Sequence, residues 1–93
     1  MKKELPEFIQ ELDRQYQLSY DKKIGLIMHL SGVICSLVDN VPIPKKYNYK
    51  NIISTHKKTY EYLYDLVEMI EEPFHIQFSD SDIASLITII KEI

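Results

Sequence analysis

The sequence has few of the residues that mark secreted or turn-rich proteins. Its one cysteine, Cys35, can form no internal disulfide, whereas a secreted domain of 93 residues usually carries several cysteines. Only two glycines occur, and both lie inside one apolar segment, which argues against a turn-rich all-β fold. These absences favour a helical protein in a reducing, cytoplasmic compartment.

The sequence also lacks a long hydrophobic run and a strongly basic character. The most apolar stretch, residues 24–38, contains a histidine and is shorter than the roughly 20 residues that a membrane span requires. Residues 1–3 lead directly into polar and charged residues, so we expect no signal peptide and no membrane partner. The net charge is −3, and the basic clusters Lys45-Lys46 and Lys57-Lys58 are short, so we expect no direct nucleic-acid binding.

Motifs for catalysis and metal binding are absent as well. The sequence contains no Gly-rich phosphate loop, no nucleophile elbow and no paired metal-ligand spacing. His29 and Cys35 are six residues apart, which places them about 120° from one another on a helix, so they do not converge on a metal. We therefore expect a protein that is no enzyme, with no catalytic residues, no metal site and no cofactor.

Hydrophobic periodicity predicts an all-α fold in a single domain, residues 1–93. Apolar residues from Leu5 to Tyr16 recur at three- and four-residue steps, which indicates a first helix. Asp21 is a suitable N-cap for a second helix from about Lys22 to Val38. Apolar residues surround most of this second helix, which is typical of a central, buried helix.

The second half of the chain predicts three more helical segments after a proline-containing loop at residues 40–50. Residues 52–56 form a short helix, and the apolar face from Tyr60 to Ile70 marks a longer one that ends at Pro73. His56 is expected as a half-buried polar contact on the helix face of Ile53 and Tyr60, and His75 receives no role. An extended segment follows, and a capping box then opens the last helix, with Ser79 as the cap and Asp82 as its acidic partner.

One narrow stripe of the second helix differs from its apolar surroundings. Gly25, His29, Gly32 and Ser36 follow the spacing i, i+4, i+7 and i+11, so they share a face. On one interpretation His29 is a packed histidine with one hydrogen bond, beside glycines that allow close helix approach. On the other, the small neighbours leave its ring reachable, and a neutral imidazole nitrogen accepts a phosphoryl group near pH 7.

Three segments together resemble the PTS regulation domain. They are the run Gly25-Leu26-Ile27-Met28-His29-Leu30-Ser31-Gly32-Val33-Ile34, the loop Asn40-Val41-Pro42-Ile43-Pro44, and the later Phe78-Ser79-Asp80-Ser81-Asp82-Ile83-Ala84. They occur in the order of that family and close to its spacing. The resemblance covers roughly residues 20–92, and the variant found in LevR-like AAA+ activators and in small free-standing members is the most similar.

The resemblance implies a compact bundle of about five helices that often pairs as a homodimer and senses carbohydrate supply. Members of the family are phosphorylated on histidine by HPr or by a sugar-specific EIIB protein, which changes the activity of a linked or separate transcription regulator. His29 matches the first family histidine and is thus the implied phosphoacceptor. Ser36 stands where many members have an arginine, and Ile89 lies near the position of a second histidine, so the resemblance implies at most one phosphorylation site.

Two hypotheses about function follow. In the first, the chain is a signalling module phosphorylated at His29, and the phosphate loosens the surface that packs over this residue. Alternatively, Lys45 or Lys46 of the loop reaches the phosphate and tightens that surface. In the second, it is a degenerate helical module for dimerisation or docking that is never phosphorylated, which Ser36 and Ile89 favour.

Overall fold

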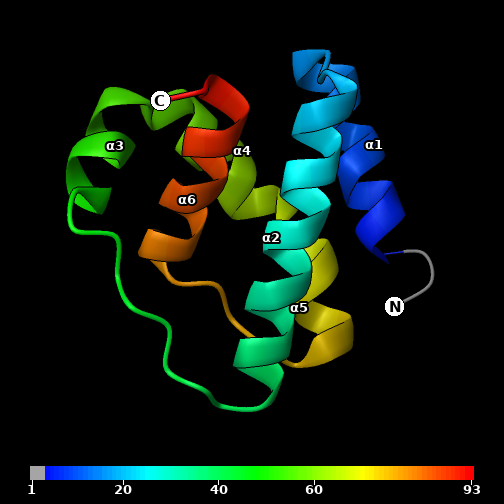
Figure 1. Cartoon of the computed structure of the whole chain (residues 1–93), viewed down its shortest axis with the longest axis vertical. Helices are drawn as coiled ribbons and strands as arrows, with labels where there is room; N and C mark the ends of the chain where they lie inside the picture. Colours follow the sequence, from blue (N-terminus) through cyan, green and yellow to red (C-terminus); the bar gives the residue numbers. More distant parts are fainter. Residues whose placement is uncertain (1–3) are drawn as a thin grey trace.

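The structure is a computed structural model that describes residues 4–93, and helices make up most of it (Figure 1). The described residues form six helices and no strand: α1 (Glu4–Tyr16), α2 (Tyr20–Val38), α3 (Tyr49–Thr55), α4 (Lys57–Leu66), α5 (Glu68–Phe74) and α6 (Asp80–Lys91). Only Val67 separates α4 from α5, so these two continue one another. The predicted all-α bundle of about five helices is confirmed.

The last helix occupies the centre of the bundle. Helix α6 packs against α2, α3 and α4, and seven of its twelve residues are buried, whereas only four of the nineteen residues of α2 are buried. The prediction that the second helix is central and buried all round is therefore wrong. Helix α2 packs mainly against α1 and α6. Its outer side, with Ile24, Ile27 and Met28, is exposed within the described residues.

The second helix begins two residues earlier than predicted. Ser19, not Asp21, is its N-cap: the Ser19 hydroxyl accepts a hydrogen bond from the Lys22 backbone N–H at 3.2 Å. Asp21 lies in the first turn, where its negative charge suits the positive end of the helix dipole. The apolar periodicity starts only at Ile24, so it did not distinguish the two capping residues.

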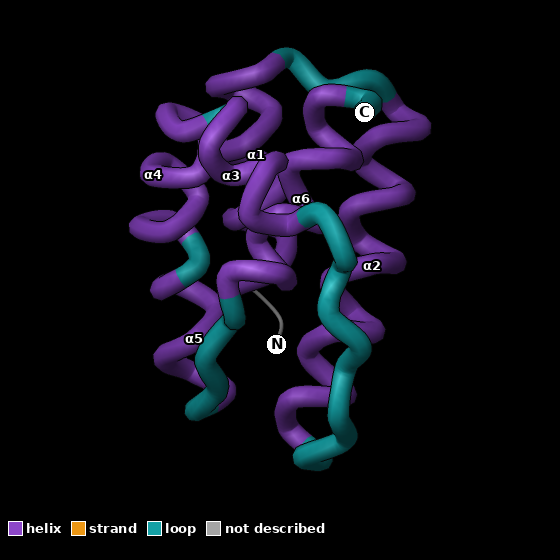
Figure 2. The backbone as a smooth tube through the Cα atoms, turned by 90° about the vertical axis from the view of Figure 1, so that its left-hand side faces the viewer, coloured by secondary structure: helices purple, strands orange, loops and turns teal. Residues whose placement is uncertain are grey.

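The middle of the chain crosses from one side of α6 to the other. Residues 39–48 form a loop from the end of α2 to α3 (Figures 1 and 2). His56 lies at the junction of α3 and α4, so its predicted position on a helix face is wrong. Helix α5 ends one residue after Pro73, and the chain leaves it through His75 in the left-handed conformation, with φ of 55°.

The predicted capping box at the start of α6 is confirmed. The Ser79 hydroxyl accepts the Asp82 backbone N–H at 3.1 Å, and the Asp82 carboxylate accepts the Ser79 backbone N–H at 2.9 Å. Asp82 is buried. The cap therefore brings a carboxylate into the interior at the N-terminus of α6.

Candidate functional site around His29

His29 lies in the middle of α2 at the edge of an open hollow. The hollow has a volume of about 340 Å³ and is lined by residues of α2 and of the loop that follows it: Met28, His29, Gly32, Val33, Ser36 and Ile43. Helical spacing accounts for Gly32 and Ser36, which lie on the face of His29 as the sequence indicates. The loop contributes Ile43 to the lining.

The two glycines of the predicted stripe have different surroundings. A Cβ atom on Gly32 would meet no atom within 4 Å, so this position leaves open space beside the histidine. A Cβ atom on Gly25 would lie 3.9 Å from Cγ2 of Ile89 on α6. Gly25 thus belongs to the contact between α2 and α6, and it does not line the hollow.

The His29 ring is half-buried and forms no hydrogen bond with any described residue. Its Nε2 atom is enclosed and has no hydrogen-bond partner within residues 4–93. The interpretation as a packed histidine satisfied by one hydrogen bond therefore does not fit the described part of the chain. An enclosed imidazole nitrogen without a partner is costly, and such atoms are uncommon in folded proteins.

Burial keeps the His29 ring uncharged at neutral pH. Desolvation lowers its pKa from the ordinary value of 6.5; the negative charge of Asp82 opposes this shift, and the positive charge of Lys46 adds to it. Both charged groups come from outside α2. The backbone N–H of Lys46 donates to the Ser81 hydroxyl at 2.7 Å, so the loop is attached to the start of α6 next to Asp82.

The lowered pKa of His29 predicts a pH-dependent stability. The folded state binds the proton less strongly than the unfolded chain, so this group's stabilisation is complete above pH 6.5 and is lost as the pH falls from there through the lowered pKa. We expect the free energy of unfolding to fall less between about pH 7.5 and 5.5 in His29→Gln than in the wild type. Urea titrations of both proteins at the two pH values measure this, and equal losses would contradict it.

The other candidate residues do not gather at this site. His56 lines a separate hollow beside α3, and His75 is exposed at the end of α5. Cys35 is exposed on α2 and does not line the hollow. Among residues 4–93 no group of three or more histidine, cysteine, aspartate or glutamate side chains is arranged to hold a metal ion. No helix in the same part of the chain is long and apolar enough to cross a membrane.

Sequence reasoning placed Asp82 only in the cap of α6 and did not connect it with His29. The two residues are 53 positions apart, so no local spacing relates them, and only the packing of α6 on α2 brings the carboxylate near the ring. Sequence reasoning gave Lys45 or Lys46 as a partner for the phosphate and did not choose between them. The attachment of its backbone to Ser81 distinguishes it from Lys45.

Comparison with known proteins identifies the family of the chain. The sequence profile of the family described as PRD domain matches residues 6–93, nearly the whole chain. No curated protein and no solved structure matches. The resemblance to the PTS regulation domain is thus confirmed over a longer span than the three segments that first indicated it. The chain belongs to the PRD domain family, a family of regulatory modules that the phosphotransferase system controls and not a family of catalytic domains.

Proposed function

We propose that the chain is a regulatory module of carbohydrate-responsive transcription control in which His29 accepts a phosphoryl group from HPr or an EIIB protein. The observation that carries the proposal is the open hollow beside an uncharged, half-buried histidine with no hydrogen-bond partner. Gly32 supports it, since a larger side chain there would fill part of the approach.

The enclosed Nε2 atom selects the nitrogen that reacts. The lone pair of Nδ1 attacks the phosphorus of the donor, a P–N bond forms, and the bond between phosphorus and the donor side chain breaks. The proton of the ring stays on Nε2, where the negative charge of Asp82 stabilises the positive charge that the ring acquires. The lowered pKa keeps the ring in its nucleophilic form before the transfer.

Phosphorylation adds a charge of about −1.5 to −2 at this position. The positive charge of Lys46 reaches the ring and would compensate part of the phosphate charge. The negative charge of Asp82 also reaches the ring and would repel the phosphate. Ser36, in place of the arginine common in the family, adds no positive charge to the hollow. We expect the net effect to loosen whatever surface packs over His29, by about 1–3 kcal/mol.

The proposal predicts acid-labile, base-stable phosphate on His29. Incubation with phosphoenolpyruvate, enzyme I, HPr and candidate EIIB proteins should label the wild type and not His29→Ala, because His29 is the histidine that lines the open hollow. His56→Ala and His75→Ala are the matched controls and should keep the label. Label that persists in His29→Ala, or no label from any donor, would reject phosphorylation at this residue.

A second copy of the chain is the partner that we propose for the exposed apolar side of α2. Met28 is 70% exposed there, with Ile24 and Ile27 beside it. A groove of about 570 Å³ between α1 and α2 adjoins Ile27 and is lined by Leu5, Pro6, Ile9, Gln10, Asp13 and Lys23 as well. Pairing through this face would cover the apolar side chains, and Met28 also borders the His29 hollow, so a phosphate there lies next to the pairing surface.

This pairing predicts a dimer mass at tens of micromolar protein in light scattering after size exclusion. Met28→Asp should shift the protein to the monomer, since an isologous interface carries the buried charge twice. Val41→Asp, an equally polar change at an exposed loop residue, should leave the mass unchanged. A monomeric wild type would contradict the prediction.

The second candidate function is a dimerisation or docking module without phosphorylation. The observation that favours it is the position of Ile89, which lies against Gly25. The resemblance places the second histidine of many family members near Ile89. That part of α6 is thus used for apolar packing. The labelling experiment distinguishes the two functions, and the dimer is common to both.

A further inference from the structure

The positive charges of the chain are concentrated in one segment. Between Asp39 and Glu61 no acidic residue occurs, yet five of the eleven lysines and arginines lie there: Lys45, Lys46, Lys50, Lys57 and Lys58. The rest of the chain holds all fourteen acidic residues and six basic ones, a net charge of −8. The sequence shows these lysines as separate short clusters, and the fold decides whether they form one surface.

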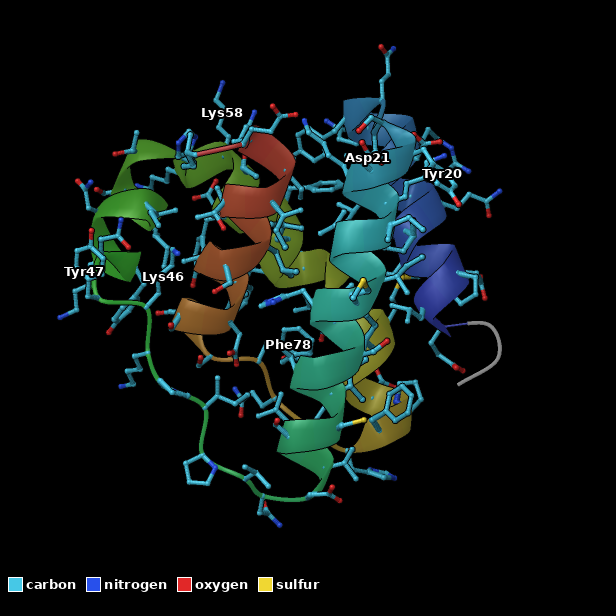
Figure 3. The ribbon with its side chains drawn as sticks, viewed as in Figure 1. Tyr20, Asp21, Lys46, Tyr47, Lys58 and Phe78 are labelled. Carbon is cyan, nitrogen blue, oxygen red and sulfur yellow. The ribbon has the colours of Figure 1, made fainter. Side chains whose placement is uncertain are left out.

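The fold places these lysines around α3. Lys45 and Lys46 precede this helix, Lys50 lies on it, and Lys57 and Lys58 follow its end at the start of α4. A helix of seven residues is only about 10 Å long, so its two ends present their lysines close together. Figure 3 shows Lys46, Tyr47 and Lys58 around α3, on the side of the molecule away from α1. We call this set of five lysines with Tyr47 the α3 surface.

None of the five lysines forms an ion pair with a described residue. Basic residues elsewhere do: Lys22 pairs with Glu92 at 2.9 Å, Lys23 pairs with Asp13 at 3.2 Å, and Arg14 pairs with Glu11. Helix α3 itself is held firmly, because Ile52 is buried against the core and α3 packs along α6. The α3 surface is therefore an array of lysines without ion-pair partners among the described residues.

An aromatic side chain stands within this array. Tyr47 is 96% exposed, the most exposed of the large hydrophobic side chains in the described residues. A hollow of about 410 Å³ lies beside it, lined by Lys46, Tyr47, Asn48, Asn51, Ile52, Thr55, His56, Thr88 and Ile93. These lining residues include no aspartate and no glutamate. Tyrosine is enriched at protein interfaces, where its ring provides contact area at a small cost in conformational entropy.

We propose that the α3 surface docks an acidic face of a partner protein, with Tyr47 as the apolar anchor and the lysines as the charges that attract and orient the partner. Complementary charge of this kind raises association rates and excludes partners of the wrong sign. The proposal does not require phosphorylation of His29: within the α3 surface only Lys46 acts on that ring, through its charge, and the variants below leave Lys46 unchanged.

The same observations disfavour a nucleic acid as the occupant. The one arginine, Arg14, lies on α1, so the α3 surface has no guanidinium for paired contacts with phosphates or bases. It offers a single exposed aromatic ring rather than a row of stacking platforms. A long polyanion that ran past α3 would also meet the remainder of the molecule, with its net charge of −8.

The test measures binding of a defined acidic probe by fluorescence anisotropy. The probe is a fluorescein-labelled, glutamate-rich peptide of about twelve residues with one central phenylalanine, in about 150 mM salt, where screening suppresses weak long-range attraction. Replacing Lys45, Lys50 and Lys57 by glutamate should weaken binding at least about tenfold. Tyr47→Ala should weaken it severalfold without changing its salt dependence, because the ring carries no charge.

A matched triple variant separates local from overall charge. Arg14→Glu, Lys23→Glu and Lys91→Glu together change the net charge equally and leave the α3 surface intact, so they should alter affinity by less than about threefold. Equal losses in the two triple variants, or no loss in the first, would overturn the proposal. A single-stranded oligouridylate of equal length that binds as tightly as the peptide would overturn it in favour of a nucleic acid. Circular dichroism melting of each variant confirms that it is folded.

Discussion

Ile34→Ala is expected to lower the free energy of unfolding by about 2–5 kcal/mol. Ile34 is only 3% exposed and belongs to the core that α2 shares with α1 and α6. Removal of its branched side chain loses the transfer free energy of three carbon atoms and leaves a cavity that surrounding helices fill only in part. Urea denaturation followed by circular dichroism measures the loss, with unchanged steepness of the transition as the sign that both states keep their compactness.

Ile24→Ala is the matched control on the same helix. Ile24 is 39% exposed, so the same change of residue removes side-chain atoms that still contact water. In the monomer, at protein concentrations too low for pairing, we expect a loss below about 1 kcal/mol, since surface substitutions have small effects. A loss at Ile24 that equals the loss at Ile34 under these conditions would contradict the exposure of the outer side of α2. At concentrations where the proposed dimer forms, Ile24 is covered and its loss should rise.

These two isoleucines show what hydrophobic periodicity predicts and what it does not. The pattern located α2, but it assigned both Ile24 and Ile34 to a buried surface because apolar residues surround most of the helix. Which side is buried depends on the neighbours that fold against it, and these are α1 and α6. Helix α6 is shorter than α2, and its central position follows from its packing between α2, α3 and α4, which no local pattern contains.

Local chemistry was the more reliable guide where a short-range hydrogen bond decides the structure. The capping box of Ser79 and Asp82 closes within four residues, and the sequence predicted it correctly. Ser19 and Asp21 are both good caps, so the choice between them depended on where the chain turns, and the prediction failed.

The candidate site divides in the same way. His29, Gly32 and Ser36 share a helix face, and periodicity alone placed them together. Ile43, Lys46 and Asp82 come from other elements, and only the loop and the docking of α6 bring them to the histidine. Gly25 fits the spacing but lies against Ile89 of α6. The same face of α2 is therefore covered by α6 at Gly25 and open at Gly32.

Asp82 connects the stability of α6 with the chemistry of His29. Its carboxylate accepts the Ser79 backbone N–H in the cap, and its negative charge raises the pKa of His29 against the effect of burial. A residue that serves both purposes makes the protonation of the histidine depend on an intact α6 terminus. Fraying of this terminus would move the charge away from the ring.

Asp82→Ala is expected to destabilise the protein by about 1–2 kcal/mol, because the buried cap loses one of its two reciprocal hydrogen bonds. Asp82→Asn keeps an oxygen that can accept the Ser79 N–H, so its loss should be smaller. Both variants should lower the pKa of His29 further, since the negative charge that favours the imidazolium is removed. NMR titration of the His29 ring protons measures this shift.

Asp80→Asn is the control for the loss of one charge from the first turn of α6. Asp80 is exposed, and its carboxylate accepts the Tyr60 hydroxyl at 2.7 Å, a contact that raises the pKa of Tyr60 to about 12. It does not contribute to the field at His29, so Asp80→Asn should leave the titration of this histidine unchanged. If Asp82→Asn and Asp80→Asn shift the His29 pKa equally, the effect is one of overall charge, and Asp82 has no particular relation to the ring. If Asp82→Asn alone lowers it, the N-terminus of α6 sets the protonation of the residue that we propose as the phosphoacceptor.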